Sequence, residues 1–398
     1  MFENVPRHLH DAFFALRADG DARTHQPYGL SPLCSDTIAA LGSCTANPLT
    51  SALLQRACTL DLTADPTEHL RRTFGAAYCQ LSPSGTDAEY NVALSASLQG
   101  RPLIQLMADP REVGSGTHIA AQGWPHQVGC AVAHDLPLQT HLYFYPLRDN
   151  NGHALPLDMV ANKAWNKALH AQTTHPNAQL LAHFVPCTKT GLMGLSEEMC
   201  RTLQTQRRAL IVVDASQGRW NDNDIQRWLA FGWPVIITGS KRWGAPPFCS
   251  AVLYPPEWAI APYSDLQTVA QTPGLKARWA LALTHLNNPT PVAHQRLLWQ
   301  QALAESFLPN LPASVAASVQ THGLGEIATF STGLSHENNK LLHRCLIDKH
   351  NAFIGQPVDT GAGSLLRVAL GAGMRTLAQM QEPLERVAKA LHHELHHA

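Results

Sequence analysis

Short apolar runs alternate with amphipathic stretches through the middle of the chain. The runs occupy 102–108, 141–146, 179–186, 210–213 and 234–238, and helical patterns at 88–96, 155–169 and 197–210 separate several of them. The run Leu210 to Val213 is rich in β-branched residues, which is typical of a parallel strand buried on both faces. The alternation predicts βαβ units, a mostly parallel sheet and an α/β fold class.

The pattern changes on both sides of this region. Residues 1–50 form an N-terminal arm, in which 28–48 mixes Gly, Ser, Thr and Pro around a brief helical pattern. Residues 51–275 then form the large domain, which begins with a helical pattern over 49–74. Prolines mark its end, and residues 276–398 form a smaller α+β domain. That domain has helical patterns at 277–303, 337–349 and from 377, strands at 327–331 and 365–370, and a loop at 353–357.

Two of the apolar runs end in side chains with complementary chemistry. The run 210–213 ends in Asp214, and the run 234–238 is closely followed by Ser240 and Lys241. Ligands of open α/β sheets bind at the carboxyl ends of the strands, so we expect an acid and an amine at one sheet edge. This pair suits the pyridine cofactor pyridoxal phosphate, because the carboxylate keeps the ring nitrogen protonated while the lysine forms an imine.

A third stretch has the features of a phosphate cradle. Ser84, Gly85 and Thr86 stand directly before the helical pattern 88–96. The free N–H groups of a helix start, together with two hydroxyls, are able to hold a phosphate. Each motif also has an ordinary explanation on its own, as a strand-end turn, a helix N-cap or a solvated loop lysine. Their order and spacing together favour the cofactor.

Taken together, the three motifs resemble fold-type I pyridoxal-phosphate enzymes, most closely the class V aminotransferase group, which includes cysteine desulfurases and kynureninases. The resemblance covers residues 75–255 well and the C-terminal part loosely. It implies a large domain with a seven-stranded type of sheet, a smaller α+β domain and pyridoxal 5'-phosphate. It also implies that the N-terminal segment within 1–50 contributes to the substrate side, and that each site of a homodimer is completed from the other subunit. In this reading Lys241 holds the cofactor and moves the Cα proton, and Asp214 stabilises the pyridinium.

The same resemblance implies roles for several further residues. Gln217 matches the residue beside the phenolic oxygen of the cofactor, and Thr188 matches a residue that makes a polar contact to it. Arg367 matches the arginine that pairs with the substrate carboxylate. The residues that match the phosphate ligands are Ser84, Gly85, Thr86 and Ser240. An arginine in an otherwise apolar strand is rarely buried without a partner, and its guanidinium suits a planar carboxylate.

The glycine-rich bend after the run 102–108 departs from the family pattern. Where the desulfurases carry a ring-stacking histidine, residues 113–115 have no aromatic side chain, so His118 would have to reach from a later position. Glu112 in this bend is a candidate acid for proton transfer above the imine, and a solvated loop acid is the alternative explanation.

Reaction type is left open by the sequence. We predict a substrate that is an amino acid or contains an amino-acid group, processed through loss of a bond at Cα. A lyase or synthase-like role, by elimination, replacement or carbon-carbon bond formation, is preferred over an aminotransferase. A standard desulfurase is disfavoured, since Cys187 lies outside the C-terminal half that carries the desulfurase persulfide cysteine. A non-catalytic regulator that binds the cofactor or an amino acid is the rival from another class, and the presence of both Asp214 and Lys241 counts against it.

The composition of the chain limits the kinds of partner and the cellular location that we expect. The 398 residues are 45% hydrophobic and 15% charged, with a formal net charge of -1, which gives no reason to expect nucleic acid or a membrane surface as a partner. No apolar run approaches the length of a membrane span, and the N-terminus does not have the pattern of a secretory signal. Nine scattered cysteines without a C-x-x-C pair read as reduced thiols in a cytoplasmic protein.

One metal motif is present at the end of the chain. Residues 393–397, HELHH, satisfy the H-E-x-x-H pattern of zinc proteases. No third ligand follows and no cleft can be built downstream, so we expect a polar helix end here and no metal site.

Overall fold

The apolar runs form one sheet in the computed structural model, which describes residues 39–42, 65–124, 138–221, 223–245, 249–259, 273–286, 292–371 and 374–396. The sheet has seven strands in the order β2-β8-β7-β6-β5-β3-β4. β3 to β7 run parallel, whereas β8 is antiparallel to both of its neighbours. The predicted α/β class with a mostly parallel sheet is therefore confirmed. The strands are β2 (Tyr78–Ser82), β3 (Leu103–Ala108), β4 (Thr140–Tyr145), β5 (Gln179–Phe184), β6 (Leu210–Asp214), β7 (Val235–Thr238) and β8 (Ser250–Tyr254).

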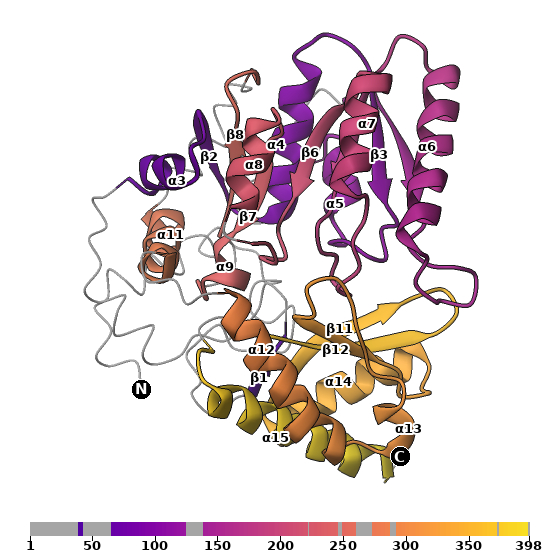
Figure 1. Ribbon diagram of the computed structural model, residues 1–398, viewed down its shortest axis with the longest axis vertical. Helices are drawn as coiled ribbons and strands as arrows, with labels where there is room; N and C mark the ends of the chain where they lie inside the picture. Colours follow the sequence, from indigo (N-terminus) through magenta and orange to yellow (C-terminus); the bar gives the residue numbers. More distant parts are fainter. Residues whose placement is uncertain are drawn as a thin grey trace.

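Helices cover both faces of this sheet (Figure 1). On one face α4 packs its small residues against Val212, Ile236 and Val252. On the other face Ile211 and Val213 meet the apolar sides of several helices. Successive residues of β6 thus point into two different cores, which is why its sequence is continuously apolar. The helices of this domain are α3 (Pro66–Phe74), α4 (Gly85–Ser97), α5 (Thr117–Ala121), α6 (Leu157–Thr174), α7 (Glu197–Arg207), α8 (Asp224–Ala230), α9 (Gly239–Arg242) and α11 (Pro273–Leu286).

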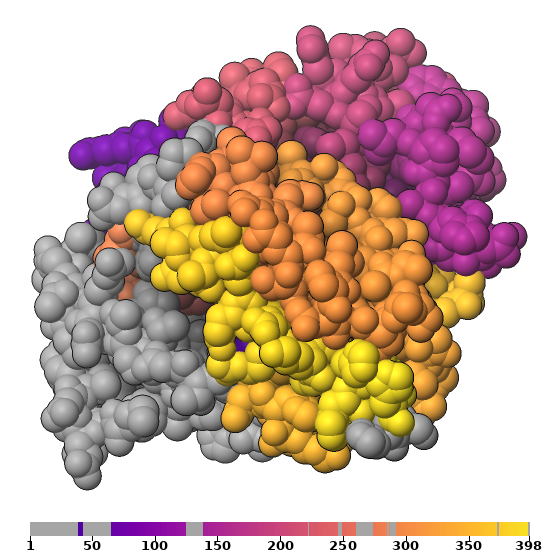
Figure 2. Space-filling model, turned by 60° about the horizontal axis from the view of Figure 1, so that its bottom comes forward, coloured from indigo at the N-terminus to yellow at the C-terminus, as the bar shows by residue number. Residues whose placement is uncertain are grey.

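A second, five-stranded sheet forms the smaller domain, in the order β1-β11-β12-β10-β9. Its core combines inward-facing strand residues with the apolar sides of α12, α14 and α15. Figure 2, in which the bottom of the view in Figure 1 comes forward, shows this C-terminal region, coloured orange to yellow, across the face turned toward the reader. The elements are β1 (Ala39–Leu41), α12 (Val292–Ala302), η3 (Leu303–Phe307), η4 (Leu308–Asn310), α13 (Ala313–Ala316), β9 (Gln320–Thr321), β10 (Ile327–Phe330), α14 (His336–His350), β11 (Ala352–Asp359), β12 (Ser364–Ala369) and α15 (Leu377–His396).

Two features of the smaller domain differ from the sequence interpretation. The predicted loop at 353–357 is wrong, because these residues lie within β11. Gly355 and Pro357 suggest a break, but a register shift between Gly355 and Val358 keeps the strand paired with β12. In addition, β1 from the N-terminal segment pairs in parallel with β11, so part of that segment belongs to the smaller sheet.

Several predicted elements lie wholly or partly outside the described residues. These are the N-terminal helix and arm, most of the segment 28–48 and the helical pattern before residue 65. Within the described ranges, none of the helices combines the length and the apolar character that crossing a membrane requires.

Candidate functional site

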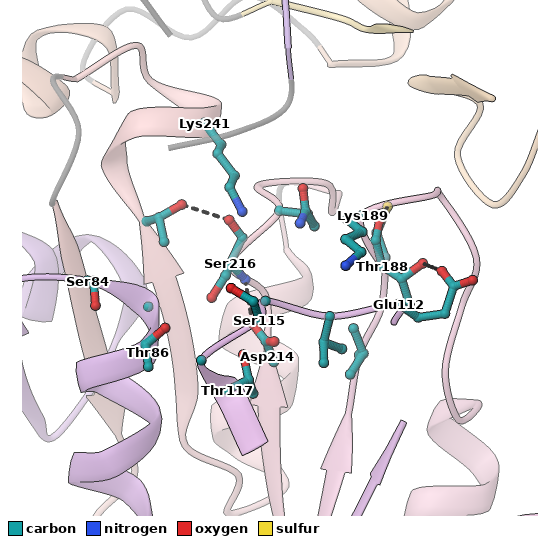
Figure 3. Close-up of a pocket in the computed structure, with 18 of the residues that line it drawn as sticks. Ser84, Thr86, Glu112, Ser115, Thr117, Thr188, Lys189, Asp214, Ser216 and Lys241 are labelled. Carbon is teal, nitrogen blue, oxygen red and sulfur yellow. Dashed lines mark hydrogen bonds between the residues drawn. The ribbon is translucent and has the colours of Figure 1, made fainter. Parts of the chain in front are cut away.

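The three sequence motifs line a single pocket of about 220 Å³ at the carboxyl edge of the large sheet, where the smaller domain closes it. Figure 3 shows Lys241 reaching into this pocket, with Ser84 and Thr86 on one side and Glu112, Thr188 and Lys189 on the opposite side. All the residues that the sequence analysis assigns to the cofactor, the substrate carboxylate or proton transfer line it: Ser84, Gly85, Thr86, Glu112, Thr188, Asp214, Gln217, Ser240, Lys241 and Arg367.

The loop after β6 holds Asp214 at the pocket floor. The Asp214 carboxylate accepts a hydrogen bond from the backbone N–H of Ser216 at 3.0 Å. The Thr238 hydroxyl, at the end of β7, donates to the Ser216 carbonyl at 2.7 Å. These two bonds fix the acid against the strand that leads to Lys241.

Lys241 is placed by a short helix that needs a glycine at its start. A Cβ on Gly239, the first residue of α9, would lie 2.6 Å from the Cys249 sulfur and 3.0 Å from the Ala282 Cβ. The close approach seats α9 against the start of β8 and against α11. The following residues, Ser240 and Lys241, therefore enter the pocket from a fixed backbone.

The start of α4 supplies donors on the opposite side. Ser84 caps the helix, since its Oγ accepts from the Asp87 N–H at 3.1 Å, and its carbonyl accepts from the Ala88 N–H at 3.0 Å. Within the described part of the chain, no acceptor binds the N–H groups of Gly85 and Thr86. A Cβ on Gly85 would lie 3.1 Å from the Ser216 Oγ, so this helix start packs directly on the Asp214 loop. The donor set fits a phosphate next to a pyridine ring.

Glu112 is buried, and its carboxylate already accepts hydrogen bonds from neighbouring side chains. Its carboxylate accepts from the Arg148 Nε at 2.6 Å, and the hydroxyls of Thr188 and Thr190 also donate to it. The carbonyl of Glu112 accepts from the Lys189 N–H at 3.0 Å. A carboxylate held this way is suited to fixing the loop 188–190 rather than to carrying a proton to Cα. The same bonds commit the Thr188 hydroxyl proton to Glu112.

Lys189 is a pocket residue to which the sequence interpretation assigns no role. It follows the buried strand β5, just as Lys241 follows β7, and this strand-end position was the available signal. Burial, together with the nearby charge of Arg367, lowers the pKa of Lys189 to about 8. The pocket thus holds a second amine besides Lys241.

Arg367 enters the pocket from β12 and is 5% exposed. It lies opposite Gly355 of β11, and a Cβ on Gly355 would come within 2.3 Å of the Arg367 Cγ. The arginine side chain therefore lies across the neighbouring strand in space that only glycine leaves open. Gly355 sets the direction in which the guanidinium points.

We predict that Gly355→Ala displaces the Arg367 side chain and weakens binding of substrate carboxylates by about 10–100-fold, since a shift of about 1 Å has effects of this size. Cofactor affinity is expected to stay unchanged, because Gly355 belongs to the smaller sheet and is not among the described residues that line the pocket. Titration with carboxylate ligands measures the effect. Gly363→Ala is the matched control, since nothing lies within 4 Å of a Cβ there. Equal affinities in the two variants would contradict the prediction.

A buried ion-pair cluster joins the two domains beside the site. Arg219 donates to Glu326 at 2.9 Å and to the Leu370 carbonyl at 2.7 Å. Arg296 donates to the other oxygen of Glu326 at 2.6 Å. Because Arg219 belongs to the loop after Asp214 and Leu370 directly follows β12, the cluster fixes Arg367 relative to Asp214.

Two further sequence expectations concern the ring face and the cysteines. His118 does not line the pocket and packs instead edge-on against Phe144, with 6.4 Å between ring centroids. Among the described residues that line the pocket, no side chain is aromatic, and Val113, Ser115 and Thr117 occupy the corresponding wall. Burial raises the pKa of the Cys187 thiol to about 12, which agrees with discounting it as a nucleophile.

The C-terminal HELHH stretch makes a different contact from that of a zinc protease. The Glu394 carboxylate binds His350 at 2.8 Å and accepts from the Cys345 thiol at 3.0 Å, and these bonds lower its pKa to about 2. The possible ligand atoms of His350, His393 and Glu394 lie within 4.8 Å of one another. His397, the second histidine of the motif, lies outside the described residues. Glu394 thus ties α15 to α14.

Comparisons with known proteins identify the fold. No protein-family model and no curated protein sequence matches the chain. The alanine–glyoxylate aminotransferase from Nostoc sp. is 16% identical, with a TM-score of 0.59 over 93% of this chain and 98% of that one. A serine palmitoyltransferase determined with PLP is 13% identical, with a TM-score of 0.53 over 98% and 85%. Mouse cysteine sulfinic acid decarboxylase is 13% identical, with a TM-score of 0.54 over 89% and 84%. These likenesses confirm the fold-type I architecture predicted from the sequence.

Proposed function

We propose that this protein is a pyridoxal-phosphate-dependent enzyme that acts on an amino acid or an amino-acid-containing metabolite. The observation that carries the proposal is the convergence of Lys241, Asp214 and the start of α4 on one pocket. The fold of the similar structures supports it, since one of them was determined with PLP. Many functions share this fold, so the side chains of the site carry the functional argument.

The residues present fit the cofactor. The N–H groups of Gly85 and Thr86, with the hydroxyl of Ser240, would hold its phosphate at the start of α4. The Ser84 hydroxyl donates to the Asp87 carboxylate at 2.6 Å, so Ser84 contributes to this site by capping the helix. Asp214 would pair with the ring nitrogen from the floor of the pocket, and Gln217 would lie beside the phenolic oxygen. When bound, pyridoxal phosphate supplies an aldehyde that condenses with amines and a ring that accepts electrons from Cα.

The protein's own groups then act on the substrate. Arg367 orients the substrate carboxylate through charge-assisted hydrogen bonds, which fixes the orientation of Cα. Lys241 would take or return a proton at Cα. We propose that Glu112 acts indirectly, by clamping the loop that carries Thr188 and Lys189.

For reaction type we propose a lyase or synthase-like activity, with an aminotransferase as the alternative. The absence of an aromatic wall among the described lining residues and the high pKa of Cys187 both disfavour a standard desulfurase. Incubating the protein with a panel of amino acids distinguishes the two remaining classes. Accumulation of pyridoxamine phosphate indicates transamination, whereas release of ammonia or a leaving group indicates elimination.

The proposal is tested by fixing the cofactor to the protein. We expect the purified protein to be yellow, and borohydride to attach the cofactor irreversibly to one lysine, because hydride reduces an imine to a stable amine. Mass spectrometry of the digest should find the label on the peptide that contains Lys241. Label on Lys189, the other amine of the pocket, would overturn the assignment of Lys241.

We further propose a homodimer, as the fold resemblance implies, located in the cytoplasm, as the cysteines suggest. The described cysteines, Cys79, Cys187, Cys200, Cys249 and Cys345, are free thiols, which suits a reducing compartment.

A further inference from the structure

The pocket has more positive charge on its substrate side than a simple amino acid requires. Its charged lining residues in the described part of the chain are Glu112, Lys189, Asp214, Lys241 and Arg367. Arg148 neutralises Glu112 in a buried ion pair. Under the proposed function the cofactor uses Asp214 and Lys241. Arg367 is assigned to the α-carboxylate of the substrate, so Lys189 is the cation of this set that still has no assigned role.

Lys189 is unsuited to the cofactor phosphate. Figure 3 shows Lys189 on the wall opposite Ser84 and Thr86, with its amine pointing into the pocket. Its amine also forms no ion pair within the described residues, since no carboxylate there lies within ion-pair distance of it. The nearest acids, Glu112 and Asp109, are paired with Arg148 and Arg111.

The backbone of Lys189 is held in place from several directions. Its N–H donates to the Glu112 carbonyl at 3.0 Å. The hydroxyls of both neighbouring residues, Thr188 and Thr190, donate hydrogen bonds to the Glu112 carboxylate. The turn is closed by a hydrogen bond of 2.7 Å from the Thr188 N–H to the Leu192 carbonyl. Such a rigid support is characteristic of a residue that binds a ligand rather than of a solvated loop lysine.

From this geometry we infer that Lys189 forms a second anion subsite, and that the substrate is an amino acid whose short side chain ends in an anionic group such as a carboxylate or sulfinate. The inference rests on the proposed function, because that function assigns the other charges of the pocket. Arg367 takes the α-carboxylate, and Lys189 takes the distal anion across the same pocket. Glu112 is a positioning residue for this subsite.

The charges around Lys189 determine its pH dependence. Arg367 from β12 and Lys241 from α9 lower its pKa, together with burial, and Glu112 and Asp109 from the loop after β3 raise it, with a resulting value of about 8. The amine is therefore cationic below about pH 8 and loses its charge above it. Affinity for a second anion is expected to fall as the pH rises from 7 to 9.

Two amine-free ligands test the subsite without any turnover. Succinate has two carboxylates, whereas butyrate has the same chain length and one. Calorimetric titration of the cofactor-loaded protein measures both affinities. Lys189→Met should lower the affinity for succinate by about 10–100-fold, as loss of a charge-assisted hydrogen bond does, and should leave the affinity for butyrate unchanged within about twofold. Lys189→Arg should keep the preference for succinate. The preference should fall above pH 8 in the unmodified protein and be independent of pH in Lys189→Met.

Lys163→Met, an exposed lysine of α6, controls for the general loss of a positive charge. Equal succinate affinities in Lys189→Met and the unmodified protein would overturn the inference. An equal loss of affinity for succinate and for butyrate would also overturn it, since Lys189 would then only shape the pocket. Borohydride labelling of Lys241 reports on the proposed function separately, so a labelled Lys241 with unchanged succinate binding rejects the subsite alone.

Discussion

Lys241→Ala is expected to abolish covalent attachment of the cofactor and to lower the rate of Cα–H exchange by about 10²–10⁴-fold, the usual contribution of a positioned acid or base. The side chain lies on a helix whose position is set by Gly239 and not by the lysine itself. The fold and the phosphate donors at Gly85 and Thr86 should therefore survive. Cofactor binding becomes reversible by dialysis, and borohydride leaves no label on the protein.

Chemical rescue separates the proton-carrying role of Lys241 from a structural one. A small primary amine such as ethylamine fits the space vacated in Lys241→Ala and should restore part of the exchange rate. Exchange is followed by mass spectrometry in deuterated water, with Lys163→Ala as a surface control. Exchange at the unmodified rate in Lys241→Ala, without added amine, would show that another group moves the proton.

The sequence predicted the sheet and its two reactive strand ends because both depend on local patterns. A continuous apolar run followed by a polar residue marks the carboxyl end of a buried parallel strand. The sequence alone therefore predicts that Asp214 and Lys241 lie at one edge of the sheet. The start of α4 was recognisable for the same reason, since a capping serine and a glycine define a helix N-terminus locally.

The features that the sequence did not predict depend on contacts between distant segments. Glu112 reads as a loop acid, but its environment is set by Arg148 and Thr190, far along the chain. The sequence of β11 predicts a loop because Gly355 and Pro357 are local breakers, whereas the pairing that keeps it extended comes from β12. Gly355 is glycine because Arg367 lies over it, which no local pattern shows.

Asp214→Asn is expected to bind the cofactor with nearly unchanged affinity while Cα–H exchange falls by at least about 10²–10³-fold. Asparagine keeps an oxygen for the Ser216 N–H, so the loop and the contacts of Gly85 with it are preserved. It removes the charge that keeps the ring nitrogen protonated. The ring then accepts electrons poorly, and the negative charge that develops at Cα rises in free energy in a site with little water.

Two measurements on the same preparation separate affinity from chemistry in this variant. Titration of the apo-protein with pyridoxal phosphate gives the affinity, and exchange of the Cα hydrogen with deuterated solvent gives the rate. Asp158→Asn, an exposed acid of α6, controls for the loss of a negative charge elsewhere. Because only the ring nitrogen depends on the Asp214 charge, the rate should fall while the affinity holds. Exchange near the unmodified rate would remove Asp214 as the pyridinium partner, and with it the observation on which the proposed function depends.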